Sequence, residues 1–196
     1  MIKIALTKFR KHNEGNLVYT WLELPATNDE IRAALEKIGA VDGDYFISDY
    51  EAPFEINECG SLEVLNEIAK KINTDSDIQY LLNLWNKWEE NKNYIRYNRN
   101  FQNEILSTII YINDKYDLNV ADDIIHFDRL QEMVEECVNE YNFIKLKYLL
   151  SGLDDTDDKD YFYLDRYGNA NSLHINDIHE LLKETLNKLK EALARG

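Results

Sequence analysis

"KHNEGNLVYTWLELPATNDEIRAALEKIGAVDGDYFISDYEAPFEINECGSLEVLNEIAKKI", residues 11–72, is the stretch of the chain that decides its fold. Within it, LVYTWLEL alternates apolar and polar side chains, which predicts a strand with one buried face. The preceding MIKIALTKF alternates in the same way, and turn-forming residues 13–16 lie between the two segments. The sequence therefore predicts an antiparallel hairpin at the start of the chain.

A helix is predicted directly after the hairpin. Pro25 ends the second strand, Thr27 is a favourable N-cap, and Glu30 three residues later completes a capping box. Gly39 provides the C-terminal stop of this helix. The predicted buried stripe consists of Ile31, Leu35 and Ile38. The segment DYFISDYEAPFEI then returns as an extended stretch, in which Pro53 predicts an edge strand or a bend.

The rest of the chain changes to mainly helical patterns. Ser61 is the predicted cap of a helix with apolar positions Leu62, Leu65, Ala69 and Ile72. Residues 77–148 contain no Gly or Pro, and their apolar positions recur every three or four residues, which predicts three further helices at residues 77–95, 100–116 and 127–150. YFYLD and NSLHI predict a short strand pair, and a final helix follows with Asn176 as its predicted cap.

These elements predict an elongated α+β fold in three parts. We expect an N-terminal unit with a small antiparallel sheet and a helix (1–60), a helical middle (61–150) and a C-terminal strand–turn–helix unit (151–196). The composition supports a folded protein, because 44% of the residues are hydrophobic and thirteen are tyrosines. Acidic disordered chains, in contrast, are poor in aromatic residues.

The chain is strongly acidic, and its charge lies in two blocks. The 37 Asp and Glu exceed the 22 Lys and Arg, which gives a net charge of −15 at pH 7. Residues 13–78 carry 15 acidic against four basic side chains, and residues 116–165 have a balance of −10. Such a field repels phosphate, so it argues against direct nucleic-acid binding. It favours a partner with a basic groove, and proteins that hold DNA have such grooves.

Three phrases, NEGNLVYTWLELPAT, GDYFISDYEAPFEI and SLEVLNEIA, resemble in sequence and order the N-terminal domain of the ArdA antirestriction proteins of plasmids, transposons and phages. The resemblance covers roughly the first 75 residues. It implies a DNA-mimicking inhibitor that occupies the DNA-binding groove of a restriction–modification enzyme, with a type I complex as the expected target. It also implies a homodimer that is joined through the later part of the chain.

Regular structure can place carboxylates at a spacing similar to that of DNA phosphates. Residues four apart on a helix lie ~5–6 Å apart, which applies to Glu63 with Glu67. Residues two apart on a strand lie ~6.6 Å apart, which is the spacing of Asp42 with Asp44 and of Asp49 with Glu51. The expected partner-binding residues are Asp42, Asp44, Asp49, Glu51, Glu55, Glu58, Glu63, Glu67, Asp154, Asp155, Asp157 and Asp158. Helical spacing also applies to Glu132, Glu136 and Glu140, although an ordinary solvated face is the better explanation for those three.

The sequence offers no pattern typical of a catalytic or metal site. It contains no HExxH, P-loop, GxGxxG or GxSxG motif. The acidic run of residues 154–160 resembles a calcium loop, but Lys159 occupies the position where an EF-hand needs Gly. Cys59 and Cys137 lie far apart and outside any thiol-nucleophile signature. We therefore expect no enzymatic activity, no cofactor and no metal.

A second class of function stays open on the sequence alone. The chain could be an acidic interaction module of a mobile element that binds another target, such as a CRISPR effector or a regulator, through its aromatic helical region. Its contact residues would then be Trp85, Trp88, Tyr94 and Tyr97. In either case the absence of a CxxC pattern, a signal-like N-terminus and a long apolar run predicts a cytoplasmic protein without membrane contact.

Overall fold

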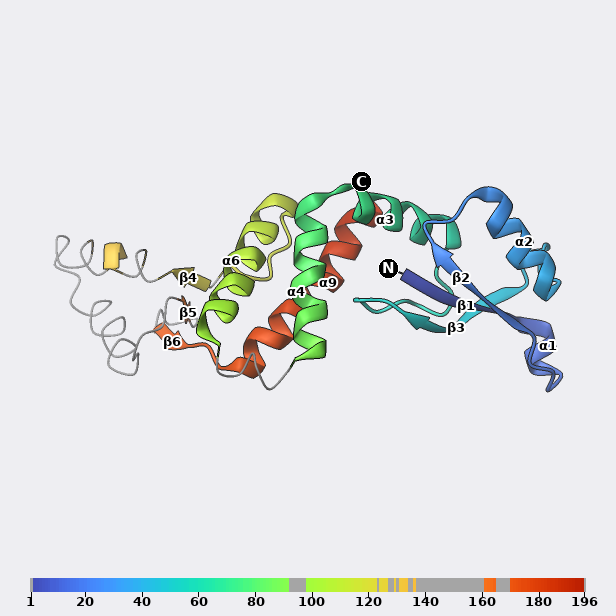
Figure 1. Ribbon diagram of the computed structural model, residues 1–196, viewed down its shortest axis with the longest axis horizontal. Helices are drawn as coiled ribbons and strands as arrows, with labels where there is room; N and C mark the ends of the chain where they lie inside the picture. Colours follow the sequence, from blue (N-terminus) through green and yellow to red (C-terminus); the bar gives the residue numbers. More distant parts are fainter. Residues whose placement is uncertain are drawn as a thin grey trace. The chain divides into compact units, whose positions relative to one another are not determined.

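The computed structural model describes residues 2–91, 98–122, 124–126, 129, 131–133, 136, 161–164 and 170–195. The chain divides into two compact units (Figure 1). The first unit consists of Met1–Leu82 with Leu186–Gly196, and the second of Asn83–Thr185. The architecture is α+β, as predicted, whereas the boundaries at residues 60 and 150 stay a prediction.

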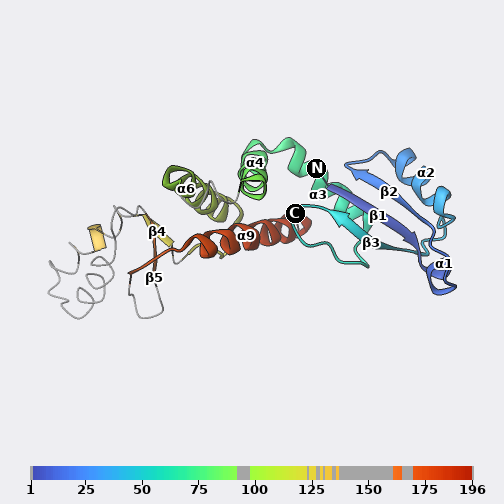
Figure 2. The same cartoon turned by 60° about the horizontal axis from the view of Figure 1, so that its bottom comes forward.

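The first unit contains a three-stranded antiparallel sheet. Strand β1 (Ile2–Lys8) lies between β2 (Tyr19–Leu24) and β3 (Tyr45–Glu51), as both views show (Figures 1 and 2). The predicted hairpin of β1 and β2 is therefore confirmed. Its connection contains a short helix, α1 (Phe9–Asn13), where the sequence predicted only a turn.

The two faces of this sheet differ in composition. One face is buried, and it carries Ile2, Ile4, Leu6, Thr20, Leu22, Leu24 and Ile47. Helices α2 (Asn28–Ile38) and α3 (Leu62–Thr74) belong to the same unit and both contact β2. The opposite face, called here the open face, carries Lys3, Ala5, Thr7, Tyr19, Trp21, Glu23, Phe46, Asp49 and Glu51. The period-two alternation of a strand separates the two sets.

Helix α2 has the predicted ends. The Thr27 backbone N–H donates to Glu30 Oε2 at 2.7 Å, and the Glu30 N–H donates to Thr27 Oγ1 at 3.3 Å, which completes the capping box. Gly39 ends the helix in the left-handed region at φ 70°. The predicted buried stripe was partly wrong: Ala34 and Ile38 are buried, whereas Ile31 and Leu35 are only half-buried. The helix therefore turns the small Ala34 toward the core, together with Ile38.

Helix α3 is joined to the rest of the unit by a buried polar contact. Asn66 is 4% exposed, and its Oδ1 accepts from the Ala26 N–H at 2.7 Å while its Nδ2 donates to the Ala26 carbonyl at 2.9 Å. Ser61 caps the helix, and its Oγ accepts from the Val64 N–H. The predicted apolar positions Leu62, Leu65, Ala69 and Ile72 are all buried.

The C-terminal end of the chain holds the segment that follows β3. Asn187 and Lys190 lie on helix α9 (Ile175–Arg195). The Glu55 backbone N–H donates to Asn187 Oδ1 at 2.8 Å, and Lys190 Nζ donates to the Glu55 carbonyl at 2.6 Å. Lys190 also lies over the Phe54 ring, 5.9 Å from its centroid. The backbone around Glu55 is therefore fixed by contacts remote in sequence.

The second unit is mainly helical, with a small sheet. Its elements are α4 (Ser76–Glu90), which begins in the first unit, α6 (Arg99–Tyr116), β4 (Ile124–His126), β5 (Tyr161–Leu164), β6 (Ala170–Ser172) and the first part of α9. The strand order is β4-β5-β6, so the predicted strand pair is confirmed. The predicted helix at residues 127–150 lies largely outside the described residues. None of the described helices is long and apolar enough to cross a membrane.

An aromatic contact joins α4 to α9 within the second unit. The His179 ring is nearly parallel to the rings of Trp85 and Trp88, with centroids 5.6 and 5.2 Å away. Trp88 is 5% exposed, and His179 Nε2 lies 3.3 Å from Glu89 Oε1. These two tryptophans thus support the packing of the unit, which disfavours their use as the principal contacts of an interaction module. The other two predicted contacts, Tyr94 and Tyr97, lie outside the described residues.

The predicted cap of α9 was wrong by two positions. The helix begins at Ile175, which places Asn176 inside its first turn. The His174 N–H instead donates to Asp177 Oδ2 at 3.0 Å, so a carboxylate of the first turn binds the backbone at the helix entrance.

We predict that Asn66→Ala destabilises the first unit by about 2–4 kcal/mol, because it leaves two buried backbone groups of Ala26 without their partner. The free energy of unfolding in urea, followed by circular dichroism, measures the effect. Asn73→Ala is the matched control, since Asn73 is exposed on the same helix and is expected to change stability by less than about 0.5 kcal/mol. Equal losses in the two variants would contradict the role of the Asn66 contact.

We also predict that Thr27→Ala lowers stability by about 1 kcal/mol at neutral pH, whereas Thr27→Ser retains the cap. Hydrogen bonds from the backbone and then the side chain of Thr27 hold the pKa of Glu30 below its ordinary value of 4.5. A lowered carboxyl pKa contributes stability above pH 4.5 that is lost as the pH falls through the folded-state value. The difference in the free energy of unfolding between wild type and Thr27→Ala should therefore become smaller in acid. Urea titrations at a series of pH values check this.

Candidate acidic partner-binding surface

Asp49 and Glu51 lie side by side on the open face of the sheet. The register places Asp49 opposite Ala5 and Glu51 opposite Lys3, so both carboxylates project from the same face of β3. Glu51 has a 70% exposed side chain and lies 4.0 Å from Lys3 Nζ. Asp49 Oδ1 accepts from the Tyr50 N–H at 2.8 Å. The strand spacing predicted for this pair is thus present in the fold.

Asp42 and Asp44 do not have the strand spacing that the sequence suggested. They lie in the turn before β3, around Gly43 at φ 84°, and the Asp44 N–H donates to Asp42 Oδ1 at 3.4 Å. Asp44 is half-buried, and its Oδ2 accepts from the Arg10 N–H at 3.3 Å. Part of the charge of Asp44 therefore stabilises the first turn of α1, while Asp42 is exposed.

Glu63 and Glu67 occupy the solvent side of α3. Because the buried residues of the helix face the core, residues 63 and 67 lie one turn apart on the outer face. Glu67 forms an ion pair with Lys70 at 2.7 Å, which offsets part of its charge. Among the described residues, no cation lies within ion-pair distance of Glu63.

Glu55 and Glu58 combine exposed carboxylates with a fixed backbone. The backbone of Glu55 is bonded to α9, as described above, and the Glu58 carbonyl accepts from the Ile47 N–H at 2.8 Å. Both side chains are exposed. All eight predicted acids of the first unit are therefore in the described part of the structure, and seven of them are exposed.

The sequence analysis did not select Trp21 and Glu23, which share the open face with Asp49 and Glu51. Lys3 pairs in register with Glu23 on β2, and its Nζ lies 5.2 Å from the centroid of the Trp21 ring. The alternation of LVYTWLEL would have identified both residues as exposed, because it places them opposite to the buried Leu22 and Leu24.

Only a part of the second acidic block, residues 116–165, lies within the described residues. Asp154, Asp155, Asp157 and Asp158 lie outside the described residues. Arg129 Nη1 binds Glu132 Oε2 at 2.9 Å and Glu136 Oε1 at 3.1 Å, and these two carboxylates raise the pKa of the arginine. The like-charged pair predicted at Glu132 and Glu136 therefore shares a local counter-charge.

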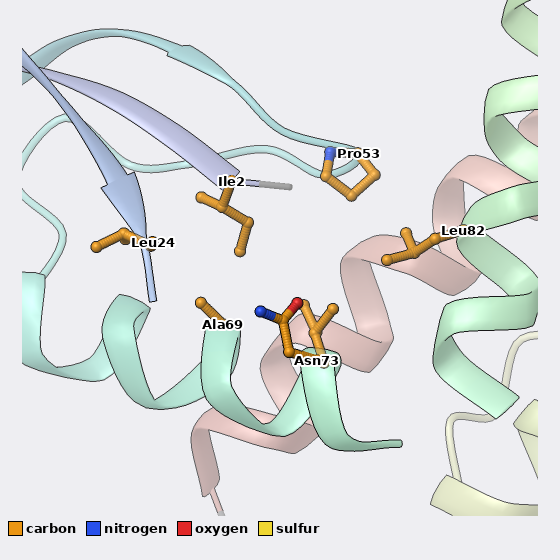
Figure 3. Close-up of a pocket in the computed structure, with 7 residues that line it drawn as sticks. Ile2, Leu24, Pro53, Ala69, Asn73 and Leu82 are labelled. Carbon is orange, nitrogen blue, oxygen red and sulfur yellow. The ribbon is translucent and has the colours of Figure 1, made fainter. Parts of the chain in front are cut away.

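A shallow hollow between the sheet and α3 has room for about one water molecule (Figure 3). Its lining is mostly apolar: Ile2, Leu24, Pro53, Ala69, Ile72, Asn73 and Leu82. Within the described part of the chain no three His, Cys, Asp or Glu side chains cluster as metal ligands would.

Comparison with known families extends the resemblance seen in the sequence. The family described as Antirestriction protein (ArdA) matches residues 4–187, which is nearly the whole chain and far more than the first 75 residues in which the resemblance was visible. No curated protein matches the chain significantly.

Proposed function

The chain belongs to the ArdA antirestriction family, whose members inhibit restriction enzymes and are not themselves enzymes, and on that premise we propose that it acts as a DNA mimic. In this proposal the exposed acids of the first unit occupy the DNA-binding groove of a restriction–modification enzyme. A type I complex is the proposed target. The acidic run at residues 154–158 is proposed to extend the same surface.

The observation that best supports mimicry is the way the acids are held. Asp49 and Glu51 lie on a paired strand, Glu63 and Glu67 lie on a helix that the Asn66 contact attaches, and the backbone of Glu55 is bonded to α9. DNA presents its phosphates on a regular scaffold, and an inhibitor that replaces it must present charge without first ordering itself. Rigid elements with exposed carboxylates meet this condition, whereas a disordered acidic tail does not.

The proposed mechanism is competitive and non-covalent. The lysines and arginines of a DNA groove release counterions when they bind phosphate, and carboxylates on a rigid surface can bind the same side chains. Enzyme that holds the inhibitor cannot hold DNA, so both cleavage and modification stop.

We also propose that the protein is a homodimer and that it is located in the cytoplasm, where restriction enzymes meet DNA. Sedimentation of the purified protein tests whether it is a dimer.

We predict that the chain inhibits a purified type I restriction–modification enzyme in competition with DNA, and that the inhibition weakens with added salt. Interactions between exposed charges are largely screened beyond ~8–10 Å at ordinary ionic strength, and added salt shortens this distance. DNA binding and cleavage, measured across a series of salt and DNA concentrations, test both points. Inhibition that is indifferent to salt would contradict mimicry, and so would inhibition that excess DNA does not relieve.

A second prediction concerns the position of the acids. Glu63→Gln with Glu67→Gln should weaken inhibition by about 1.5- to 5-fold per residue, and adding Asp49→Asn and Glu51→Gln should weaken it further in graded steps. The matched control is Glu180→Gln with Glu184→Gln, a pair of exposed acids with the same helical spacing on α9 in the second unit. Equal losses in the two helical pairs would contradict a binding surface on the first unit, and complete loss from one substitution would point to catalysis.

A further inference from the structure

The open face of the first sheet combines aromatic rings with carboxylates in three rows, and the β1–β3 register shifts between the second and the third. Each central β1 residue has one neighbour on β2 and one on β3. The first row consists of Glu23, Lys3 and Glu51, the second of Trp21, Ala5 and Asp49, and the third of Tyr19, Thr7 and Phe46. Directly opposed residues of a sheet have Cβ atoms about 4.5–5.5 Å apart, so the three residues of each row are neighbours.

The outer positions of the first two rows are open to solvent within the unit, and so is Tyr19. Tyr19 is 51% exposed and Trp21 is 37% exposed. In the middle of the surface Ala5 and Thr7 are buried, and Phe46 in the third row packs against Phe9 and His12 of α1. An exposed tryptophan beside exposed acids does not serve the core, since the core lies on the opposite face of the same strands.

The charges of the face favour a cationic partner. Three carboxylates, those of Glu23, Asp49 and Glu51, surround a single cation, Lys3. That excess of negative charge disfavours phosphate and anionic membrane, and the surface therefore fits a basic protein segment.

Lys3 also shows how a cation can bind here. Its Nζ lies 5.2 Å from the Trp21 ring centroid and 4.0 Å from Glu51 Oε2, so one ammonium group has both an aromatic and a carboxylate neighbour. With a separation of 4.0 Å and side-chain exposures of 31% and 70%, this ion pair is weak. An incoming cation can therefore compete with Lys3 for these groups.

We propose that the open face binds an arginine side chain of the inhibited enzyme, stacked on Trp21 and bonded to Asp49, Glu23 or Glu51. The proposal rests on the proposed function and names the kind of contact made by one part of that surface. Arginine fits better than lysine because its planar guanidinium can stack on a ring while its N–H groups bind a carboxylate in bidentate fashion. A surface of carboxylates alone has no ring on which to stack the guanidinium, so this face adds selectivity for arginine.

The test measures binding of two fluorescent peptides, poly-arginine and poly-lysine of equal length, to the full chain by anisotropy. We expect wild type to prefer poly-arginine by about 3-fold, as an exposed cation–π contact allows, and Trp21→Leu to abolish the preference. Trp21→Phe should restore part of it. Glu63→Gln with Glu67→Gln should weaken the binding of both peptides by the same factor, because in the proposal those acids have no neighbouring ring.

The control variant is Tyr111→Leu, which removes a ring that is 53% exposed on α6 of the second unit and is expected to leave the preference unchanged. Melting temperatures verify that each variant is folded. Equal binding of the two peptides by wild type, or an unchanged preference in Trp21→Leu, would overturn the inference. The peptide assay contains no restriction enzyme, so it separates the two proposals: inhibition without arginine preference refutes only the open-face contact, and arginine preference without inhibition refutes only the antirestriction target.

Discussion

The pair of hydrogen bonds between Asn66 and Ala26 is the contact on which the first unit depends most directly. Ala26 belongs to the short connection between β2 and α2, and its N–H and carbonyl are buried, so both groups need a partner inside the protein. The side chain of Asn66 satisfies both and thereby attaches α3 to the end of the sheet. With the inner side of α3 fixed in this way, Glu63 and Glu67 face solvent. A buried polar contact thus determines where an acidic surface lies.

The alternation of β1 and β2 made much of this unit predictable. One set of residues builds the core and the other builds the open face, and the capping box of α2 and the strand pair of the second unit follow from equally local patterns. The predictions that were wrong have physical causes that are not local in sequence. Asp42 and Asp44 are two residues apart, as neighbours on one face of a strand are, but a side-chain hydrogen bond between them forms a turn instead. The depth of Ile31 and Leu35 depends on how α2 is rotated against the sheet, and the entrance to α9 depends on Asp177 rather than on Asn176.

The candidate surface could be predicted only in part from the sequence, for a similar reason. Counting charge identifies an acidic block but not which acids remain free of counter-charge. Lys70 lies against Glu67, and Arg129 lies between Glu132 and Glu136, whereas Glu63 has no cation nearby among the described residues. Trp21 was not predicted as part of the surface, because an aromatic residue in a strand is more often part of a core. The alternation of its own strand indicates that it is exposed, but only the register places it on the same face as Asp49 and Glu51.

The difference between an acidic protein and a DNA mimic lies in what holds the carboxylates. A long acidic side chain on a flexible backbone loses conformational entropy when it binds, and each immobilised side chain of this kind costs about 0.5–1.5 kcal/mol. In the first unit the backbones of the candidate acids are already fixed by strand pairing, by helix packing and by the contacts of Asn187 and Lys190 with Glu55. The remaining cost falls on the side chains alone. Fixed acids flanking an exposed ring can therefore favour both the charge and the shape of a basic side chain, which a disordered acidic segment cannot do.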